Sequence, residues 1–140
     1  MEQTLRMKST LNIVLWVLQA LFALAYLNAG YLKTFRPIQE IAPTIFWAPS
    51  LPDLMVRFIG ACELLGAVGL ILPALVKILP QLTALAAACL TLVMLAANIF
   101  HIARGEFFVL PMTGTFLVLV AFIAYGRWKL CPITPRKQAV

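Results

Sequence analysis

The chain has 140 residues, of which 63% are hydrophobic and 11% are charged, and its mean hydropathy is +0.97. A soluble domain carries roughly a quarter of its residues as charged side chains, so this composition excludes a soluble globular protein and indicates an integral membrane protein. The net charge of +6 does not indicate a nucleic-acid partner, because basic residues beside membrane spans serve topology and attraction to anionic lipids.

Four apolar segments are long enough to cross a hydrocarbon core of about 30 Å at about 1.5 Å per residue. They lie at approximately 11–33, 54–72, 79–102 and 111–128. The sequence therefore predicts an all-α membrane protein, with residues 1–140 forming a single domain that is a four-transmembrane-helix bundle. Arg6 and Lys8 precede the first segment as in a secretory signal, but its apolar stretch is longer than a usual signal core, so we expect a retained span.

Lysine and arginine residues flank these spans unevenly. Seven lie on the side of the termini, namely Arg6, Lys8, Lys77, Arg127, Lys129, Arg136 and Lys137. Four lie on the other side, namely Lys33, Arg36, Arg57 and Arg104. Because lysine and arginine are enriched in cytoplasmic loops, this bias predicts a multi-pass protein of the cell inner (cytoplasmic) membrane with both termini in the cytoplasm.

The longest connection, at residues 34–53, combines several prolines with an apolar face. The prolines prevent a continuous helix, whereas Ile38, Ile41 and Ile45 recur at helical spacing and Phe46 and Trp47 follow them. This pattern predicts a short Pro-rich interfacial cap between the first and second spans, partly buried over the bundle. A simple aromatic anchor at the membrane interface is the alternative.

Glu63 lies near the middle of the second span. A carboxylate at bilayer depth is unfavourable by several kcal/mol unless it is paired or hydrated, so it is typical of a ligand, proton or ion site inside a bundle. Gly60, Gly66 and Ala67 lie three or four residues from Glu63 and share its face, which predicts close helix packing there. Gly30 flanks the polar stripe of the first span and is expected to pack in the same way.

Polar residues form a stripe on each of two other spans. In the first span they recur every seven residues, which a left-handed bundle places on one face, as Asn12, Gln19, Tyr26 and Lys33. In the third span they follow three- and four-residue steps, as Thr91, Met94, Asn98 and His101. Both stripes are expected to face Glu63 and to enclose a polar cavity that opens outward beneath the cap.

These positions supply the candidates for ligand binding or proton exchange: Glu63, His101, Asn98, Tyr26, Lys33 and Arg57. The structural alternative is a buried salt bridge from Glu63 to one of the three basic candidates, which would fix the helix register. Lys33 and Arg57 are alternatively interface anchors whose long side chains reach the membrane surface. Asn12 and Gln19 are more simply explained by hydrogen bonds between helices. No catalytic residue is assigned.

The sequence also limits the chemistry. A single histidine cannot supply the paired axial ligands of a typical membrane haem, and Cys62, Cys89 and Cys131 are too scattered for a metal site. No Cys-x-x-Cys, phosphate-binding glycine loop or nucleophile elbow is present. We therefore expect no metal and no intrinsic cofactor, and any redox role requires a mobile carrier such as a quinone, or a partner subunit.

Several short motifs carry a family resemblance. They are AGYLK at 29–33, RFIGACELLGA at 57–67, GLILP at 69–73, NIFH at 98–101 and RGE at 104–106. With these motifs the chain resembles the DoxX-like family of small four-helix membrane proteins over residues 11–128. The resemblance implies the fold and the membrane location but no single reaction, because the family includes a subunit of a thiosulfate:quinone oxidoreductase and terminal oxidase assembly, members of redox-defence complexes, and distant relatives that look like receptor assembly chaperones. The large extracytoplasmic domain of the thiosulfate-oxidising assembly is not found here, so that reaction is not expected of this chain alone.

Three functional hypotheses follow. The first is a redox-associated subunit, at most a subunit of a quinone-linked oxidoreductase, that binds a lipophilic ligand such as a quinone in the outward-facing polar cavity and works with a redox partner subunit. The second is a membrane-protein assembly or interaction partner with Glu63 in a structural ion pair. The third and weaker one is a small proton-coupled carrier, for which four spans without an internal repeat require oligomerisation. The lipid bilayer is the expected partner in each case, and the small-residue faces permit a homo-oligomer.

Overall fold

A computed structural model of the chain describes residues 2–136. Within this range all regular structure is helical, and four helices are long and apolar enough to cross a membrane. They are α1 (Glu2–Phe35), α3 (Asp53–Val76), α4 (Gln81–Ala103) and α5 (Leu110–Tyr125). A 3-10 turn at Phe107–Val109 and a π-helical turn at Gly126–Leu130 extend α5 at its two ends. The prediction of an all-α membrane protein with four spans is confirmed.

Two helix ends differ from the sequence prediction. Helix α1 begins at Glu2 rather than near residue 11, because residues 2–10 are mostly good helix formers and continue the helix beyond its apolar segment. Helix α3 continues past Pro73 to Val76. Ala74, on this last turn, is 1% exposed and packs into the bundle, and the chain reverses only at Lys77, whose φ is 58°.

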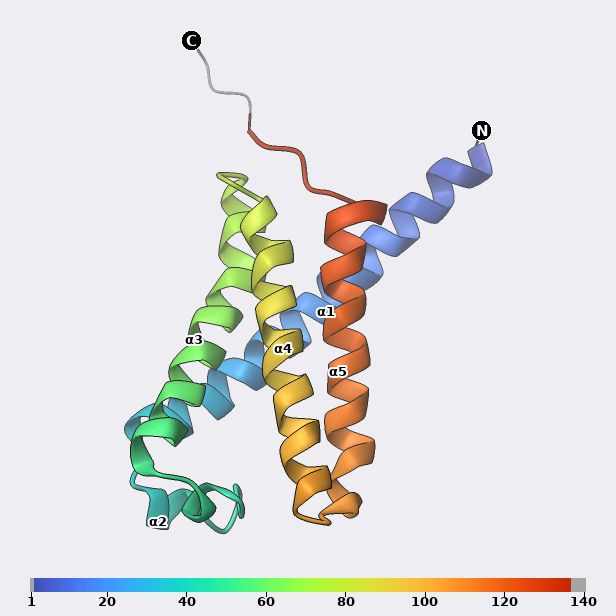
Figure 1. Cartoon of the computed structure of the whole chain (residues 1–140). Coiled ribbons are helices and arrows are strands. Elements are labelled where there is room, and N and C mark those ends of the chain that lie inside the picture. Colours follow the sequence, from blue (N-terminus) through green and yellow to red (C-terminus); the bar gives the residue numbers. More distant parts are fainter. Residues whose placement is uncertain (1, 137–140) are drawn as a thin grey trace.

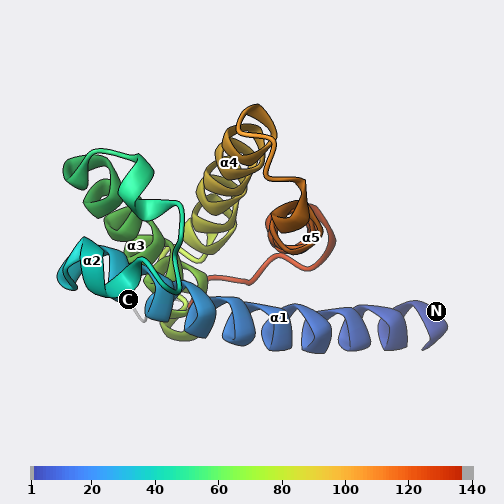
Figure 2. The ribbon, with the colours of Figure 1, turned by 90° about the horizontal axis from the view of Figure 1, so that it is seen from below.

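The four helices form two pairs. Helix α1 packs on α3, α5 packs on α4, and the pairs are joined where α3 packs on α4. Figures 1 and 2 show that α1 is steeply tilted and that the pairs diverge away from the α3–α4 hairpin. We call the end with this hairpin the closed end and the opposite end the open end. The start and the end of the described chain both lie on the side of the closed end (Figure 1). Lys137, which contributed to the predicted orientation, lies outside the described residues.

Glycines set the closest helix contacts. A Cβ at Gly30 would lie 2.8 Å from the Gly60 carbonyl oxygen, so the backbones of α1 and α3 approach closely at this crossing. At the closed end, a Cβ at Gly66 would lie 2.5 Å from the side chain of Leu90 on α4. Ala67 is 4% exposed and belongs to the apolar core between the four helices.

The connection between α1 and α3 is a compact cap at the open end (Figure 1). It contains the short helix α2 (Ile38–Ile41) and a 3-10 turn at Ala48–Ser50. Ile38, Ile41 and Ala48 are buried and form a small apolar cluster with Val56 of α3. The cap, defined here as residues 36–52, is therefore held to the α1/α3 pair by its own apolar core.

Candidate functional site

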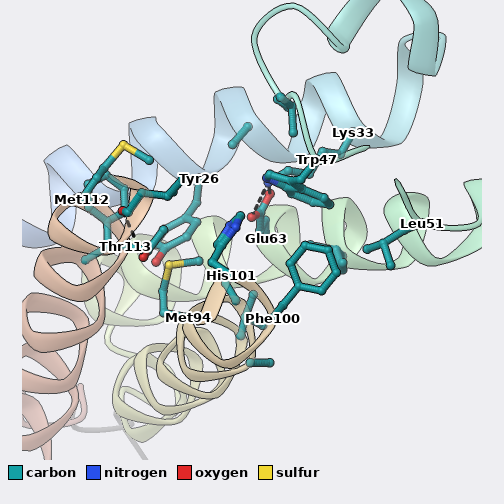
Figure 3. Close-up of a pocket in the computed structure, with 18 of the residues that line it drawn as sticks. Tyr26, Lys33, Trp47, Leu51, Glu63, Met94, Phe100, His101, Met112 and Thr113 are labelled. Atoms are coloured by element: carbon teal, nitrogen blue, oxygen red, sulfur yellow. Dashed lines mark hydrogen bonds and ion pairs between the residues drawn. The ribbon is translucent and has the colours of Figure 1, made fainter. Parts of the chain in front are cut away.

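A cavity of ≈ 650 Å³ lies between the two helix pairs at the open end. Residues from α1, α3, α4, α5 and the cap line it, and most of them are apolar (Figure 3). This volume is in the range of small-molecule binding sites. Four ionisable or phenolic side chains interrupt the apolar wall: Tyr26, Lys33, Glu63 and His101. The cavity therefore combines a large apolar volume with a few polar groups, as binding sites for lipophilic molecules do.

Lys33 and Glu63 form a buried ion pair at the wall of this cavity. Lys33 Nζ lies 2.6 Å from Glu63 Oε1 and 2.7 Å from Oε2, and the two side chains are 8% and 3% exposed. The close crossing at Gly30 and Gly60 brings α1 and α3 near enough for this contact. The cap covers it, because Lys33 Nζ lies 5.4 Å from the centre of the Trp47 ring. Each charge therefore compensates the other where water is largely excluded.

His101 is fixed by the turn between α4 and α5. Its Nδ1 lies 2.7 Å from Glu106 Oε2, and Arg104 Nε donates to Glu106 Oε1 at 2.7 Å. Gly105, with a φ of 71°, reverses the chain so that Glu106 returns to the His101 ring. These hydrogen bonds lower the pKa of Glu106. The bond from His101 has the largest effect, and the bond from Arg104 has the next largest. With Nδ1 donating to this carboxylate, Nε2 is the ring nitrogen that remains for a ligand.

Tyr26 supplies a second polar group to the cavity. The residue is 2% exposed, and its hydroxyl is buried without a hydrogen-bond partner among residues 2–136. Figure 3 shows the Tyr26 ring beside Met94 and Thr113, away from the cap. Because a buried hydroxyl without a partner is unfavourable by about 1–3 kcal/mol, a ligand or water that hydrogen-bonds with it would be stabilised here.

Two of the six candidate residues do not line the cavity. Asn98 ties α4 to α5, because its Oδ1 accepts from Thr113 Oγ1 at 3.0 Å, while its Nδ2 donates within α4 to the Met94 carbonyl at 2.8 Å. Arg57 donates to the carbonyl oxygens of Lys33, at 3.0 Å, and of Arg36, the first residue of the cap. It thus closes the C-terminal end of α1, and the base that pairs with Glu63 is Lys33.

The polar stripe of α1 divides between two sites, because the helix is long and tilted. Only its later half reaches Glu63. Asn12 and Gln19 instead contact Arg127 near the closed end, so the expectation that the whole stripe faces Glu63 was wrong. Gln19 Nε2 also donates to the Leu70 carbonyl, as an interhelical hydrogen bond.

Sequence reasoning assigned Arg127 to the cytoplasmic flank, but the structure buries it at 4% exposure. Its Nε donates to Gln19, and its Nη1 donates to Asn12 at 2.6 Å and to the Cys131 carbonyl at 3.2 Å. The guanidinium also lies 5.3 Å from the centre of the Trp16 ring. The sequence signal for this contact was the pair Asn12 and Gln19 in an apolar helix. Their amide oxygens require hydrogen-bond donors from another part of the chain.

Within residues 2–136, no group of three or more His, Cys, Asp or Glu residues is placed to hold a metal ion. What these helices define is an integral membrane protein, a four-span bundle with a cavity between helix pairs at one end. The model of the DoxX-like family matches residues 17–123, and the chain belongs to this family. Neither a curated protein nor a solved structure matches it.

Proposed function

We propose that this protein binds a lipophilic ligand with a small polar head, such as a quinone, and serves as a redox-associated subunit of a membrane assembly. The observation that carries the proposal is the ≈ 650 Å³ cavity with apolar walls and the buried Lys33–Glu63 pair. An apolar ring fits the walls, and its polar substituents need partners that only a few side chains provide.

The polar groups of the cavity match a head group that exchanges protons. The Tyr26 hydroxyl can donate to a carbonyl oxygen, whereas Glu63 and the His101 Nε2 can each accept from a hydroxyl. A quinone that is reduced to a quinol takes up protons as well as electrons, and these side chains are the proton carriers in the proposal. The electrons come from a partner redox subunit, which makes the protein part of an assembly rather than a complete enzyme.

The proposed orientation places the open end on the outer side of the cytoplasmic membrane. The excess of lysine and arginine beside the termini supports this arrangement, since such residues favour the cytoplasmic side. The cavity and its cap then face the outer half of the bilayer, and both termini lie in the cytoplasm.

Binding of an added quinone to the purified protein in detergent tests the proposal. Trp47 lines the cavity, so a bound quinone ring is expected to quench its fluorescence, and Trp47→Phe identifies that signal. The decisive variant is Lys33→Gln combined with Glu63→Gln, because either substitution alone leaves a buried charge without its partner. The matched control is Lys129→Gln at an exposed position near the closed end. We expect saturable quenching in the unmodified protein and the control, and its loss in the double variant; equal quenching in all three would overturn the proposal.

One observation favours a second candidate function, that of a partner in membrane-protein assembly. The Lys33–Glu63 pair is satisfied internally, with both carboxylate oxygens bound by the ammonium. A structural ion pair of this kind fixes the register of α1 and α3 at their crossing without any ligand. In that case the double variant should lose a co-purifying membrane protein while quinone binding is absent from every form.

A further inference from the structure

We infer that the cavity opens sideways into the bilayer between α3 and α4, and that its ligand is a single-tailed amphiphile whose tail leaves through this opening. The inference rests on the proposed function, since it names the class of ligand and the route by which it enters. We call the opening the α3/α4 mouth and define it by Met55, Phe58, Leu92 and Ala96.

The residues of the α3/α4 mouth face two environments at once. All four line the cavity, yet Met55, Phe58 and Leu92 are 49%, 67% and 65% exposed, and Ala96 is exposed as well. They lie inside α3 and α4, helices that are long and apolar enough to cross a membrane. The surroundings of an exposed apolar side chain on such a segment are hydrocarbon chains, so the cavity is continuous with the lipid at this place.

The mouth exists because the packing between α3 and α4 changes along their length. At the closed end small residues bring the helices together, with Gly66 against Leu90 and Gly69 against Ala86. Toward the open end the facing positions are larger and include Phe58 and Phe100, and the helices diverge (Figure 1). Small residues allow close helix approach, and bulky residues prevent it.

Aromatic contacts cross two other sides of the bundle near the cavity. The cap lies over the open end and makes aromatic contacts with the α4/α5 pair: the ring centres of Trp47 and Phe100 are 6.2 Å apart, and those of Phe46 and Phe108 are 5.6 Å apart. Between α1 and α5, the Phe22 and Phe116 rings lie 4.9 Å apart, and Met112 is the exposed cavity-lining residue on this side. Within residues 2–136, no aromatic contact joins α3 to α4 across the mouth.

The distribution of polarity indicates the class of ligand. The mouth residues are all apolar and exposed, whereas the polar groups of the cavity are buried. These groups are Tyr26 and Lys33 on α1, Glu63 on α3 and His101 on α4 (Figure 3). A polar head therefore finds its partners inside, and an isoprenoid or acyl tail lies in the mouth and continues into the hydrocarbon core. A tail that stays among lipid chains requires no transfer of apolar surface into water.

The test uses two quinone probes, a long-tailed isoprenoid ubiquinone and the same ring without its tail. Ala96→Trp fills the mouth, and Leu92→Trp is a second variant at the mouth that keeps the test valid if the first does not fold. Leu65→Trp is the matched control, because Leu65 is 74% exposed on α3 and does not line the cavity. Met112→Trp tests the side of the cavity between α1 and α5, where Met112 lines the cavity and is 60% exposed.

We expect the mouth variants to weaken long-tailed ubiquinone by about tenfold or more and to change binding of the tail-less ring by less than about threefold. Leu65→Trp should bind both probes as the unmodified protein does, and Met112→Trp, which fills part of the cavity itself, should not weaken the long-tailed probe more than the tail-less ring. If Met112→Trp selectively weakens the long-tailed probe while the mouth variants do not, the tail leaves between α1 and α5 and the inference is wrong. If neither probe binds the unmodified protein, the proposed function itself fails, and the inference fails with it.

Discussion

The buried Lys33–Glu63 pair should be strongly coupled, which a double-mutant cycle can measure. Lys33 Nζ lies 2.6 and 2.7 Å from the two carboxylate oxygens, with both side chains almost fully buried. At an effective dielectric constant of about 20, two unit charges about 2.7 Å apart attract by about 6 kcal/mol. Desolvation of both ions offsets most of this attraction, so the pair as a whole adds little stability.

Substituting one partner alone lowers stability strongly, because the other charge is then buried without compensation. Lys33→Gln and Glu63→Gln are each expected to lower the free energy of unfolding by about 3–5 kcal/mol. The double variant leaves two neutral amides that can hydrogen-bond with each other, and it should be more stable than the sum of the two losses predicts. The expected coupling energy is at least about 3 kcal/mol.

The assay is unfolding of the detergent-solubilised protein by added denaturing detergent, followed by the helical circular dichroism signal. The surface pair Arg36 and Glu40 is the matched control, with an N–O distance of 2.9 Å and side chains that are 53% and 52% exposed. Its coupling should be about 0.3–0.5 kcal/mol, the usual value for an exposed pair one helical turn apart. If Lys33 and Glu63 couple no more strongly than this pair, the two charges do not compensate each other in a buried site as described here.

Three further predictions concern other parts of the bundle. Gly60→Ala should destabilise the protein by about 1–3 kcal/mol, because the new Cβ would lie 2.9 Å from the backbone nitrogen of Thr34, whereas Gly114→Ala, whose nearest atom is 3.8 Å away, should be neutral or slightly stabilising in the same unfolding assay. Arg127→Met should lower the free energy of unfolding by about 1–3 kcal/mol through loss of its hydrogen bonds to α1, while the exposed Lys129→Met should have little effect; equal effects would contradict the buried position of Arg127. The pKa of Glu106 is held below its ordinary value of 4.5, so its contribution to stability is complete above about pH 4.5 and is lost as the pH falls through the folded-state pKa. The difference in melting temperature between the unmodified protein and Glu106→Gln should therefore shrink in acid, and a difference that stays constant from pH 7 to pH 3 would refute the role of the His101 hydrogen bond.

Much of the architecture could be predicted from the sequence because lipid imposes a simple rule on it. Every spanning segment must satisfy its own backbone hydrogen bonds, so long apolar segments predict helices directly. The cap was also predictable, since its prolines exclude a continuous helix while Ile38 and Ile41 require burial. Residues 2–10 were not assigned to α1, because hydropathy marks the hydrocarbon core and not the end of a helix.

The site was only partly predictable. Glu63 was evident because an isolated carboxylate in an apolar span requires a partner, but three basic residues were equally near it along the predicted topology. The crossing of α1 and α3 at Gly30 and Gly60 decides in favour of Lys33. Such a crossing depends on the tilt of α1, which a hydrophobic pattern does not specify.

The apolar wall of the cavity carried no signal in the sequence. In a membrane protein an apolar side chain can face lipid, core or cavity, and the residue type is the same in each case. Phe58 and Leu90 illustrate this, because the first lies at the mouth of the cavity and the second is 1% exposed in the core. Arg127 was missed for the related reason that a basic residue at a span end normally faces the cytoplasm.

Native mass spectrometry of the gently purified protein, with extraction and identification of retained lipids, tests the central claim most directly. The unmodified protein and the double variant Lys33→Gln with Glu63→Gln are compared after the same purification. We predict that a quinone or another single-tailed lipophile is retained by the unmodified protein and is lost from the variant. Retention of the same bulk lipids by both proteins, with no bound lipophile that distinguishes them, would contradict a ligand site in this cavity.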